Sequence, residues 1–311
     1  MKYLVSDINE MVRRDPALFI AESEAAYMER IKNAAGAIMK NLSQSPIVLL
    51  SGPSGAGKTT TARKIEDELK AHGINTYTIS MDNYFKTLNF QTCPRTPEGE
   101  VDYESPELLD MELLNEHFKA LSEGREIHIP YYMFTRQKRS ASQFTKMRLN
   151  DNEIAIFEGI HALNDVITDK NPGAFGLYIS AEAEMIADDG AVFKPEWTRL
   201  VRRVVRDNNF RGADAKYTMG LWANVMRGER AHITPYIPKA RLRLDSTLPY
   251  ELPLLRDHAL PQLIDFSEDT PGYDEISRVV PLLEQFESIS SDLVPTDSLL
   301  REFIGGGIYE Y

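Results

Sequence analysis

The chain has 311 residues, of which 42% are hydrophobic and 26% are charged, and its formal net charge is −12. This length allows one large domain or two modest ones, and the acidic balance argues against a surface built to coat nucleic acid or an anionic membrane. A single cysteine, Cys93, excludes an internal disulfide framework and favours a reducing compartment. No apolar run is long enough to cross a bilayer, and residues 1–7 lack the apolar core of a secretory signal, so we expect a cytoplasmic protein.

Residues 1–45 are predicted to form a helical extension ahead of the main part of the chain. The pair Asp15-Pro16 is typical of a helix start, because proline is tolerated in the first turn. Apolar residues then recur at near-helical spacing from Leu18 to Ile38. We expect this extension to pack on the rest of the chain; a helix that binds a partner is the alternative.

A glycine-rich stretch at residues 51–60 is the most informative motif of the sequence. It fits the pattern G-x-x-x-x-G-K-[ST], with an apolar run at 47–50 before it and a predicted helix at 61–72 after it. Backbone N–H groups of such a loop bind phosphate, its lysine reaches the outer phosphates, and its final hydroxyl holds magnesium. Because a predicted strand precedes the stretch and a predicted helix follows it, a phosphate-binding loop is favoured over a chance glycine-rich turn. The nucleotide-binding residues expected here are Gly52, Ser54, Gly55, Ala56, Gly57, Lys58, Thr59 and Thr60, with Thr59 also a metal ligand.

Residues 46 to about 180 alternate strand-like and helix-like segments, which predicts a parallel sheet with helices on both faces. Further strands are expected at 76–80, 154–157 and 177–180, the last being the final clear strand, and a short strand at 127–129 is expected to end at Pro130.

A basic helix at 198–207 and a second helix at 214–230 follow, and the rest of the chain alternates loops with short helices. We therefore expect three parts: the extension at 1–45, a core at 46–235 and a mostly helical C-terminal region at 236–311 packed on that core. The sequence leaves open whether the last part is a separate domain.

Two carboxylates are expected beside the glycine-rich loop, because ligands bind beyond the carboxyl ends of the strands in open parallel sheets. Asp82 follows the strand at 76–80, and Glu158 ends the strand at 154–157. One carboxylate could accept a proton from an attacking hydroxyl, and the other could organise magnesium and its waters. The alternative is that Asp82 caps a helix and Glu158 makes a structural hydrogen bond.

The basic helix carries Arg199, Arg203 and Arg206 on one face and is followed by Arg211. Such a run is most often a solvated, salt-bridged surface. Close to a phosphate-binding loop, however, we expect the helix to act as a lid whose guanidinium groups neutralise a transferred phosphoryl group.

The segment from Ile129 to Gln137 is the candidate for recognising a phosphoryl acceptor. Tyr132 and Phe134 alternate, so their rings could lie on one side and stack on a planar ring, and Gln137 offers both a donor and an acceptor. From composition alone, packing of these aromatic residues in the core would be the preferred interpretation.

These motifs together resemble the uridine kinase and phosphoribulokinase family of P-loop kinases over roughly residues 46–215. The stretches that carry the resemblance are 52–59, 81–85, 129–134, 157–159 and 202–207. The resemblance implies a P-loop NTPase-type α/β fold, ATP and Mg²⁺ as cofactors, and a small-molecule substrate. Two downstream stretches, 222–229 and 301–307, resemble one subgroup of this family.

The resemblance also implies roles for single residues. Asp82 corresponds to the aspartate that takes the proton from a ribose 5′-hydroxyl; Arg203, Arg206 and Arg211 correspond to lid arginines, the first two catalytic together with Lys58. The residues that it places at the acceptor are Tyr84, Glu104 at the position of an aspartate that holds ribose hydroxyls, Asp102 as a second candidate for that contact, Tyr132 and Phe134 as base-stacking rings, and Gln137 in place of a histidine that reads a pyrimidine edge.

The function that we expect is ATP-dependent phosphoryl transfer to the 5′-hydroxyl of a uridine-like or cytidine-like nucleoside. One alternative is a kinase for a phosphorylated sugar such as ribulose 5-phosphate, which Arg136, Lys138 and Arg139 keep open. Another is a nucleotide-dependent regulatory module with little kinase activity. We expect no nucleic-acid or membrane partner, and a homo-oligomer stays open.

Overall fold

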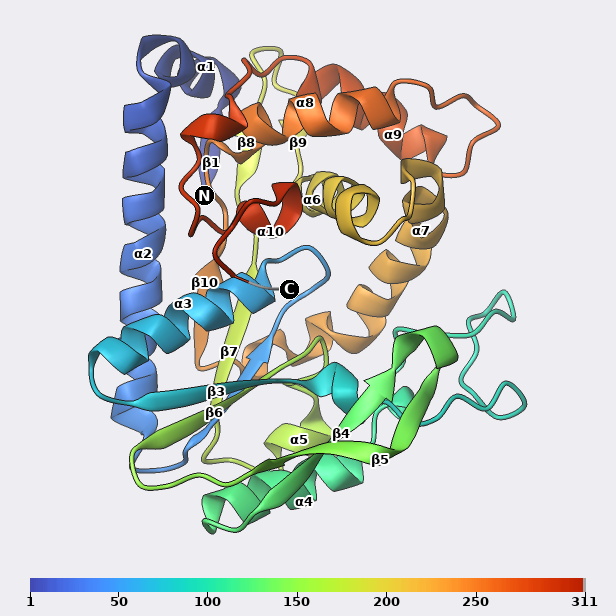
Figure 1. The fold of residues 1–311 in the computed structure, drawn as a ribbon. Helices are drawn as coiled ribbons and strands as arrows, with labels where there is room; N and C mark the ends of the chain where they lie inside the picture. The colour runs from blue at the N-terminus through green and yellow to red at the C-terminus, as the bar shows by residue number, and fades with distance from the viewer. Residues whose placement is uncertain (310–311) are drawn as a thin grey trace.

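Five short segments form a parallel sheet at the centre of the molecule, of which the computed structural model describes residues 1–309 (Figure 1). The strands are β2 (Ile47–Ser51), β3 (Asn75–Ser80), β6 (Glu153–Glu158), β7 (Phe175–Ser180) and β10 (Leu242–Asp245). They lie in the order β10–β7–β2–β6–β3, and every neighbouring pair is parallel. The predicted α/β fold with a parallel sheet is therefore confirmed.

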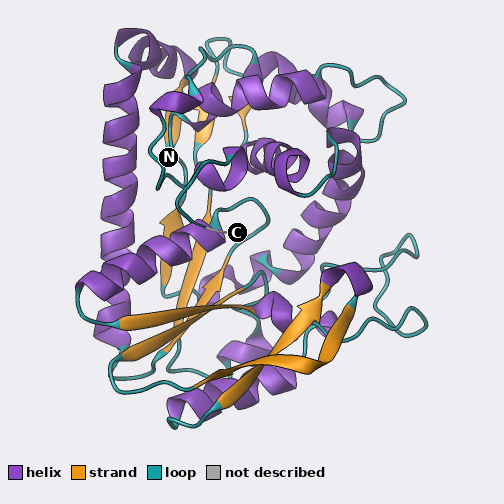
Figure 2. Ribbon diagram, viewed as in Figure 1, coloured by secondary structure: helices purple, strands orange, loops and turns teal. Residues whose placement is uncertain are grey.

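Both faces of this sheet are buried, as alternate residues of β2 show. Val48 and Leu50 belong to one hydrophobic core, and Ile47 and Leu49 belong to another. Because each face needs apolar side chains, the strand has a continuous apolar run without polar alternation. Helices cover the two faces (Figure 2). The first core includes residues of α2 (Pro16–Asn41), α3 (Lys58–Ala71) and α6 (Pro195–Phe210), and the second includes residues of α4 (Met111–Ser122) and α5 (Asp165–Thr168).

The two ends of the chain pack on the same side of the sheet. The N-terminal part forms α1 (Val5–Arg14) and the long α2, and the C-terminal part forms α8 (Glu251–Leu263), α9 (Tyr273–Leu283) and α10 (Arg301–Ile304). Tyr27 of α2, Ile65 of α3 and Leu255 of α8 are fully buried in one hydrophobic core. Both terminal regions therefore share a core with the helix that follows the glycine-rich loop.

Several strands differ from the sequence expectation. Residues 127–129 do not form a strand that Pro130 ends, because β4 (Ile127–Met133) continues through it and pairs antiparallel with β5 (Lys138–Met147). The pairing register shifts between Pro130 and Tyr132, and an irregularity of this kind accommodates a residue without an N–H group. The strand β7 is also not the last, since β10 follows it as an edge strand whose Arg243 is exposed.

A second small sheet was also not predicted. It consists of β1 (Lys2–Leu4), β8 (Glu184–Ile186) and β9 (Val192–Phe193), so the first residues of the chain pair with a segment that follows β7. These strands have two or three residues each, which is too short for a periodic pattern to show in the sequence.

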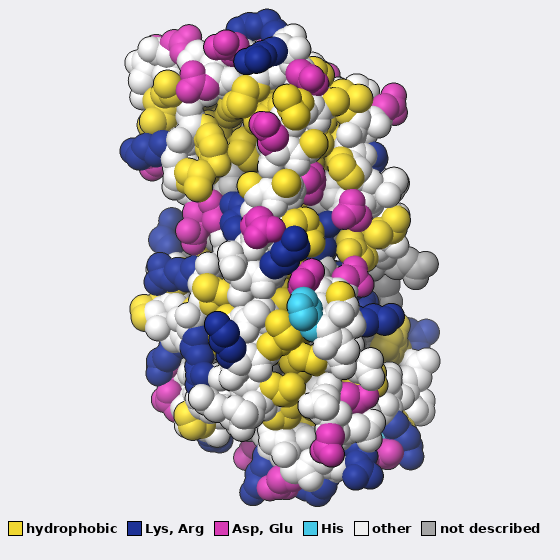
Figure 3. All heavy atoms as spheres, turned by 90° about the vertical axis from the view of Figure 1, so that its left-hand side faces the viewer, with side chains coloured by type: hydrophobic (Ala, Val, Ile, Leu, Met, Phe, Trp, Pro, Cys, Tyr) yellow, Lys and Arg dark blue, Asp and Glu magenta, His cyan; other side chains and the backbone are white. Residues whose placement is uncertain are grey.

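The surface on the α2 side carries charges of both signs, with hydrophobic side chains gathered in its upper part (Figure 3). This face has no continuous basic stripe of the kind that follows a nucleic-acid backbone. Within residues 1–309, no helix is long and apolar enough to cross a membrane.

Candidate active site

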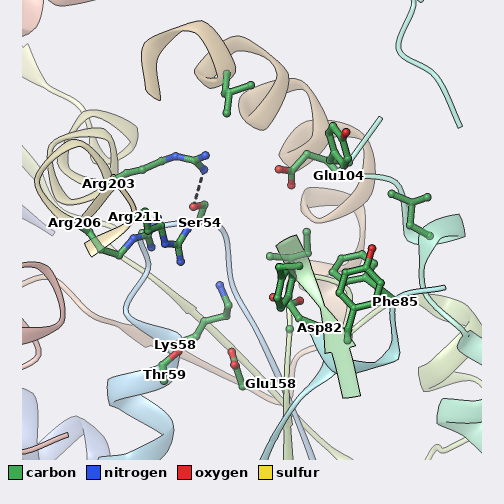
Figure 4. Close-up of a pocket in the computed structure, with 18 of the residues that line it drawn as sticks. Ser54, Lys58, Thr59, Asp82, Phe85, Glu104, Glu158, Arg203, Arg206 and Arg211 are labelled. Carbon is green, nitrogen blue, oxygen red and sulfur yellow. Dashed lines mark hydrogen bonds between the residues drawn. The ribbon is translucent and has the colours of Figure 1, made fainter. Parts of the chain in front are cut away.

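A cavity of about 580 Å³ lies at the carboxyl ends of β2, β3 and β6. Its position agrees with the rule that ligands of open parallel sheets bind beyond the strand ends. Predicted residues from distant parts of the sequence meet in its wall (Figure 4). Those that line it are Ser54, Gly55, Gly57, Lys58, Thr59, Asp82, Glu104, Tyr132, Phe134, Gln137, Glu158, Arg203, Arg206 and Arg211.

The glycine-rich loop has the backbone geometry of a phosphate cradle. Gly55 and Gly57 have φ angles of 76° and 81°, which residues with a Cβ rarely adopt. At Gly52 a Cβ atom would strike the carbonyl oxygen of Ile179. Helix α3 begins directly after this loop, at Lys58, so its first N–H groups have no intrahelical partner. The arrangement provides an anion site at a helix N-terminus.

Three ionisable side chains that line the cavity beside this cradle are Lys58, Asp82 and Glu158. Burial raises the pKa of Asp82, and it raises the pKa of Glu158 to about 7, while the nearby Lys58 charge lowers both. Burial also lowers the pKa of Lys58. Asp82 sits in a single 3₁₀ turn at Met81–Tyr84, and its side chain is exposed to the cavity. The two carboxylates and the amine thus lie close enough to influence one another's pKa, although the Asp82 side chain is open to the cavity.

Three arginines of the predicted lid are held together by one buried carboxylate, that of Asp207. Its oxygens lie 3.2 Å from Arg203 Nε, 2.8 Å from Arg206 Nη2 and 3.6 Å from Arg211 Nη1. Arg203 Nη1 also donates a hydrogen bond of 2.9 Å to Ser54 Oγ, the dashed line in Figure 4. The structure therefore presents a fixed group of cations beside the glycine-rich loop.

The other arginines of α6 have a structural role. Arg202 is fully buried, pairs with Glu251 at 2.6 Å and donates to the carbonyl of Gly55 at 3.1 Å. Arg199 is 3% exposed and donates to the carbonyl of Ser54 at 3.2 Å. The expected single stripe of Arg199, Arg203 and Arg206 is thus divided, because Arg199 supports the loop from behind and does not line the cavity.

An aromatic cluster forms the opposite wall of the cavity. The ring centroids of Phe85, Tyr132 and Phe134 lie 5.1 to 6.5 Å apart. Glu104 also lines the cavity, and it lies above Phe85 in Figure 4. Burial raises the pKa of Glu104 to about 7, and Arg203 opposes the rise. The ring planes are inclined to one another by 52° to 81°, so this wall is an angular apolar surface with a polar group at its edge.

Two expected acceptor residues do not line the cavity. Tyr84 is fully buried, and its hydroxyl is hydrogen-bonded to His117 Nδ1 at 2.9 Å. The next residue, Phe85, takes its place, because the 3₁₀ turn directs Tyr84 into the core. Asp102 is 6% exposed and pairs with Arg227 at 2.8 Å, so Glu104 is the carboxylate that reaches the cavity.

Within the glycine-rich loop, Gly52, Ala56 and Thr60 are buried behind the cavity surface. The Thr60 hydroxyl donates a 2.6 Å hydrogen bond to Glu302, which itself lines the cavity. Sequence reasoning missed Glu302, because 242 residues separate the two and no local pattern connects them.

Comparison with known proteins supports the resemblance. A family model for the phosphoribulokinase and uridine kinase family matches residues 47–249. A uridine kinase of Schizosaccharomyces pombe is 25% identical over 267 residues, which are 82% of this chain and 53% of that protein, so the chain spans about half of this relative. A uridine kinase of Halobacterium salinarum is 29% identical over 178 residues, 57% of this chain and 69% of that protein.

A solved structure, described as a possible uridine kinase from Bacillus stearothermophilus, has a TM-score of 0.44 and 18% identity. The match covers 70% of this chain and 98% of that one. The family model covers more than half of the chain. The chain therefore belongs to the phosphoribulokinase and uridine kinase family.

Proposed function

We propose that the protein is an ATP-dependent kinase that transfers the γ-phosphoryl group to the 5′-hydroxyl of a nucleoside, with uridine or cytidine as the acceptor. One observation supports this most strongly. A single cavity contains a phosphate cradle, a wall of aromatic rings and the carboxylate of Asp82, which stands between Lys58 and Phe85 in Figure 4. The relatives named as uridine kinases support the same acceptor class.

In this proposal the glycine-rich loop and Lys58 bind the phosphates of ATP. The acceptor ring packs against the aromatic wall and stacks on either Tyr132 or Phe134, because the planes of these two rings are inclined at 77° and one planar ring cannot stack on both. Gln137 then lies at its polar edge and Glu104 at the ribose hydroxyls. Asp82 then accepts the proton of the 5′-hydroxyl while the hydroxyl oxygen attacks the γ-phosphorus. The bond between that phosphorus and the oxygen that leaves with ADP breaks. Arg203 and Arg206 stabilise the charge on the transferred group.

The donor set also fits Mg²⁺. Among the described residues, no group of three or more His, Cys, Asp or Glu side chains is placed to hold a metal ion alone. Kinases bind Mg²⁺ through one or two protein oxygens together with substrate phosphates. Thr59 and Glu158, which both line the cavity, are the residues that we assign to it. The ion would neutralise charge on the donor phosphates.

The phosphosugar alternative receives less support. A second phosphate on the acceptor would need additional cations near the aromatic wall. Arg136, Lys138 and Arg139 do not line the cavity, and Arg139 is already paired with Asp110 at 2.9 Å. Lys86 is the remaining cation on this side of the cavity wall.

Release of ADP from MgATP tests the proposal. The acceptors to compare are uridine, cytidine, adenosine, guanosine, inosine, thymidine, ribose and ribulose 5-phosphate. We expect turnover with uridine or cytidine. Turnover with ribulose 5-phosphate alone would move the function to the sugar-phosphate branch of the family, and ATP binding without turnover by any acceptor would support a regulatory module.

A further inference from the structure

The stretch 222–229, which resembles one subgroup of the family, has no role in the mechanism above. It lies in helix α7 (Ala215–His232), whose Leu221 lines the cavity. Three consecutive residues near its end, Arg227, Gly228 and Glu229, contact both sides of the active site.

The first contact is with the acceptor side. Gly228 packs so closely against Glu104 that a Cβ atom at this glycine would overlap the Cβ of Glu104 and lie 2.6 Å from its Cγ. Alanine is a better helix former than glycine inside a helix, so helix propensity does not account for this residue. The missing side chain instead provides the space that Glu104 occupies.

The neighbouring Arg227 fixes the same loop through Asp102. Arg227 Nη2 donates a 2.8 Å hydrogen bond to Asp102 Oδ1, and that oxygen also accepts from the backbone N–H of Glu104 at 3.2 Å. Although burial opposes it, the hydrogen bond from Arg227 holds the pKa of Asp102 below its usual value. The ion pair and the close packing at Gly228 therefore act on Glu104 together.

Glu229 reaches the donor side. Its carboxylate pairs with both terminal nitrogens of Arg199, at 2.9 and 3.0 Å. Arg199 Nη1 donates onward to the carbonyl oxygen of Ser54, and a Cβ at Gly55 would lie 2.8 Å from the backbone oxygen of Arg199. Glu229 thus supports the glycine-rich loop through one intermediate side chain.

We propose that Arg227, Gly228 and Glu229 are positioning residues that set the acceptor carboxylate Glu104 and the phosphate loop at a fixed separation. This inference rests on the proposed function, because it assumes that Glu104 binds the acceptor. One turn of α7 then aligns the two substrates. Arg227 and Gly228 affect the acceptor through Glu104, and Glu229 affects ATP through the glycine-rich loop.

The sharpest test compares Gly228→Ala with Gly220→Ala in the same helix. Around Gly220 no atom lies within 4 Å of the added Cβ, so this variant has the same helix effect without the overlap. Since misplacing a substrate-binding group by about 1 Å costs up to about 100-fold, we expect Gly228→Ala to raise the KM for uridine about 10- to 100-fold. The KM for MgATP should stay within about twofold in both variants, and Gly220→Ala should match the unaltered protein.

Substitutions of the flanking residues should separate the two substrates. Arg227→Ala should raise the KM for uridine. Arg227→Lys keeps the charge beside Asp102, so it should raise this KM less than Arg227→Ala does. Glu229→Gln weakens the support of the glycine-rich loop, so it should raise the KM for MgATP and leave that for uridine nearly unchanged. Equal changes in both KM values for every variant would show a merely structural role and contradict the proposal.

Hydrogen exchange of residues 95–105 provides a readout that needs no turnover. Gly228→Ala should accelerate exchange in this segment, and Gly220→Ala should not. If the unaltered protein phosphorylates no nucleoside, the proposed function fails, but the exchange comparison still decides whether Gly228 positions the loop. Unchanged exchange together with an unchanged KM for uridine would overturn the inference.

Discussion

At the scale of single residues, the proposed phosphoryl transfer depends on two carboxylates that face the cavity from different walls. Asp82 is placed by a 3₁₀ turn directly after β3, and Glu104 is placed by the loop that α7 holds. The proton of the acceptor hydroxyl goes to Asp82 in our mechanism, and Glu104 orients the ribose. Each can be tested separately.

Replacing Asp82 by asparagine should stop proton acceptance and preserve the shape of the side chain. We expect kcat to fall about 10²- to 10⁴-fold, the usual contribution of general base catalysis. Nucleotide affinity, measured by titration with a fluorescent ATP analogue, should change little because the glycine-rich loop is intact. A kcat close to that of the unaltered protein would remove Asp82 from the role of base.

The pH dependence of the acceptor step should report Glu104. Burial raises its pKa to about 7, Arg203 and Lys58 oppose the rise, and Asp102 and Asp82 add to it. A carboxyl group with a raised pKa keeps its proton up to that pH, and the ionised form accepts hydrogen bonds from two ribose hydroxyls more strongly than the neutral acid does. We therefore expect kcat/KM for uridine to fall as the pH drops below about 7.

The control for this prediction is Glu104→Gln, which has no proton to lose. Its kcat/KM should be lower and its profile should lack the inflection near neutral pH. Burial also raises the pKa of Glu158 to about 7. The profiles must therefore be recorded with saturating MgATP, so that a change in MgATP binding does not alter the measured kcat/KM for uridine. A Glu104→Gln profile that keeps the inflection would assign it to another group.

The position of Asp82 directly after a predicted strand placed it at the cavity from the sequence, whereas Glu104 was indicated by the family resemblance. The resemblance failed by a single residue at Tyr84, which is buried while Phe85 lines the cavity. The direction of a side chain in a 3₁₀ turn depends on which neighbour fits the core, and a pattern of residue types does not contain that information.

At the scale of elements, helix α6 combines structural and functional arginines on adjacent positions. Arg202 is fully buried against Glu251, whereas Arg203 reaches the cavity and Ser54. Helical spacing groups Arg199 with Arg203 and Arg206, but it does not show that Arg202 is buried, since its partner Glu251 lies 49 residues away. Packing of α8 on α6 makes the distinction.

Paired substitutions on α6 should separate these roles. Arg202→Met leaves the Glu251 carboxylate buried and unpaired, so we expect the free energy of unfolding to fall by about 3 to 5 kcal/mol in urea denaturation. Arg203→Met removes a cation from the cavity wall and should lower kcat about 10²-fold with a much smaller loss of stability. If Arg202→Met is as stable as Arg203→Met, the structural assignment of Arg202 is wrong.

At the scale of the whole molecule, the C-terminal segment closes over the helix that starts at the glycine-rich loop. Leu299 packs against Gly57, where a Cβ would lie 2.5 Å from its Cδ1, and Asp297 pairs with Lys64 at 2.8 Å. Glu302 accepts from the hydroxyl of Thr60. A negative charge therefore lies at a helix N-terminus where donor phosphates are expected to bind.

Glu302→Gln should consequently favour nucleotide binding. The Glu302 carboxylate belongs to α10 and lies against the first turn of α3, so removing its charge relieves its repulsion of phosphate. Charges at a helix N-terminus contribute enough to change the KM for MgATP about two- to fivefold. We expect the KM to fall, with kcat nearly unchanged, in steady-state assays at fixed uridine. A higher KM would show that Glu302 assists donor binding.

These long-range contacts could not be predicted, although the sequence shows both partners. The α/β fold with a parallel sheet follows from local patterns and was predicted correctly, whereas the order of the strands in that sheet was not predicted. The approach of α10 to α3, and of Gly228 to Glu104, depends on how separate elements pack in three dimensions. Such contacts have no periodicity or motif that marks them in advance.

Transfer of a phosphoryl group to a nucleoside hydroxyl leaves a nucleoside 5′-monophosphate, so the proposed function is best checked by identifying the product. Uridine, MgATP and the protein are incubated together, and the products are assigned by phosphorus NMR and mass spectrometry, with Asp82→Asn as the control. We expect uridine 5′-monophosphate in equal amount to ADP, and its near absence with the control variant. ADP without a phosphorylated nucleoside, or equal product from Asp82→Asn, would contradict this proposal.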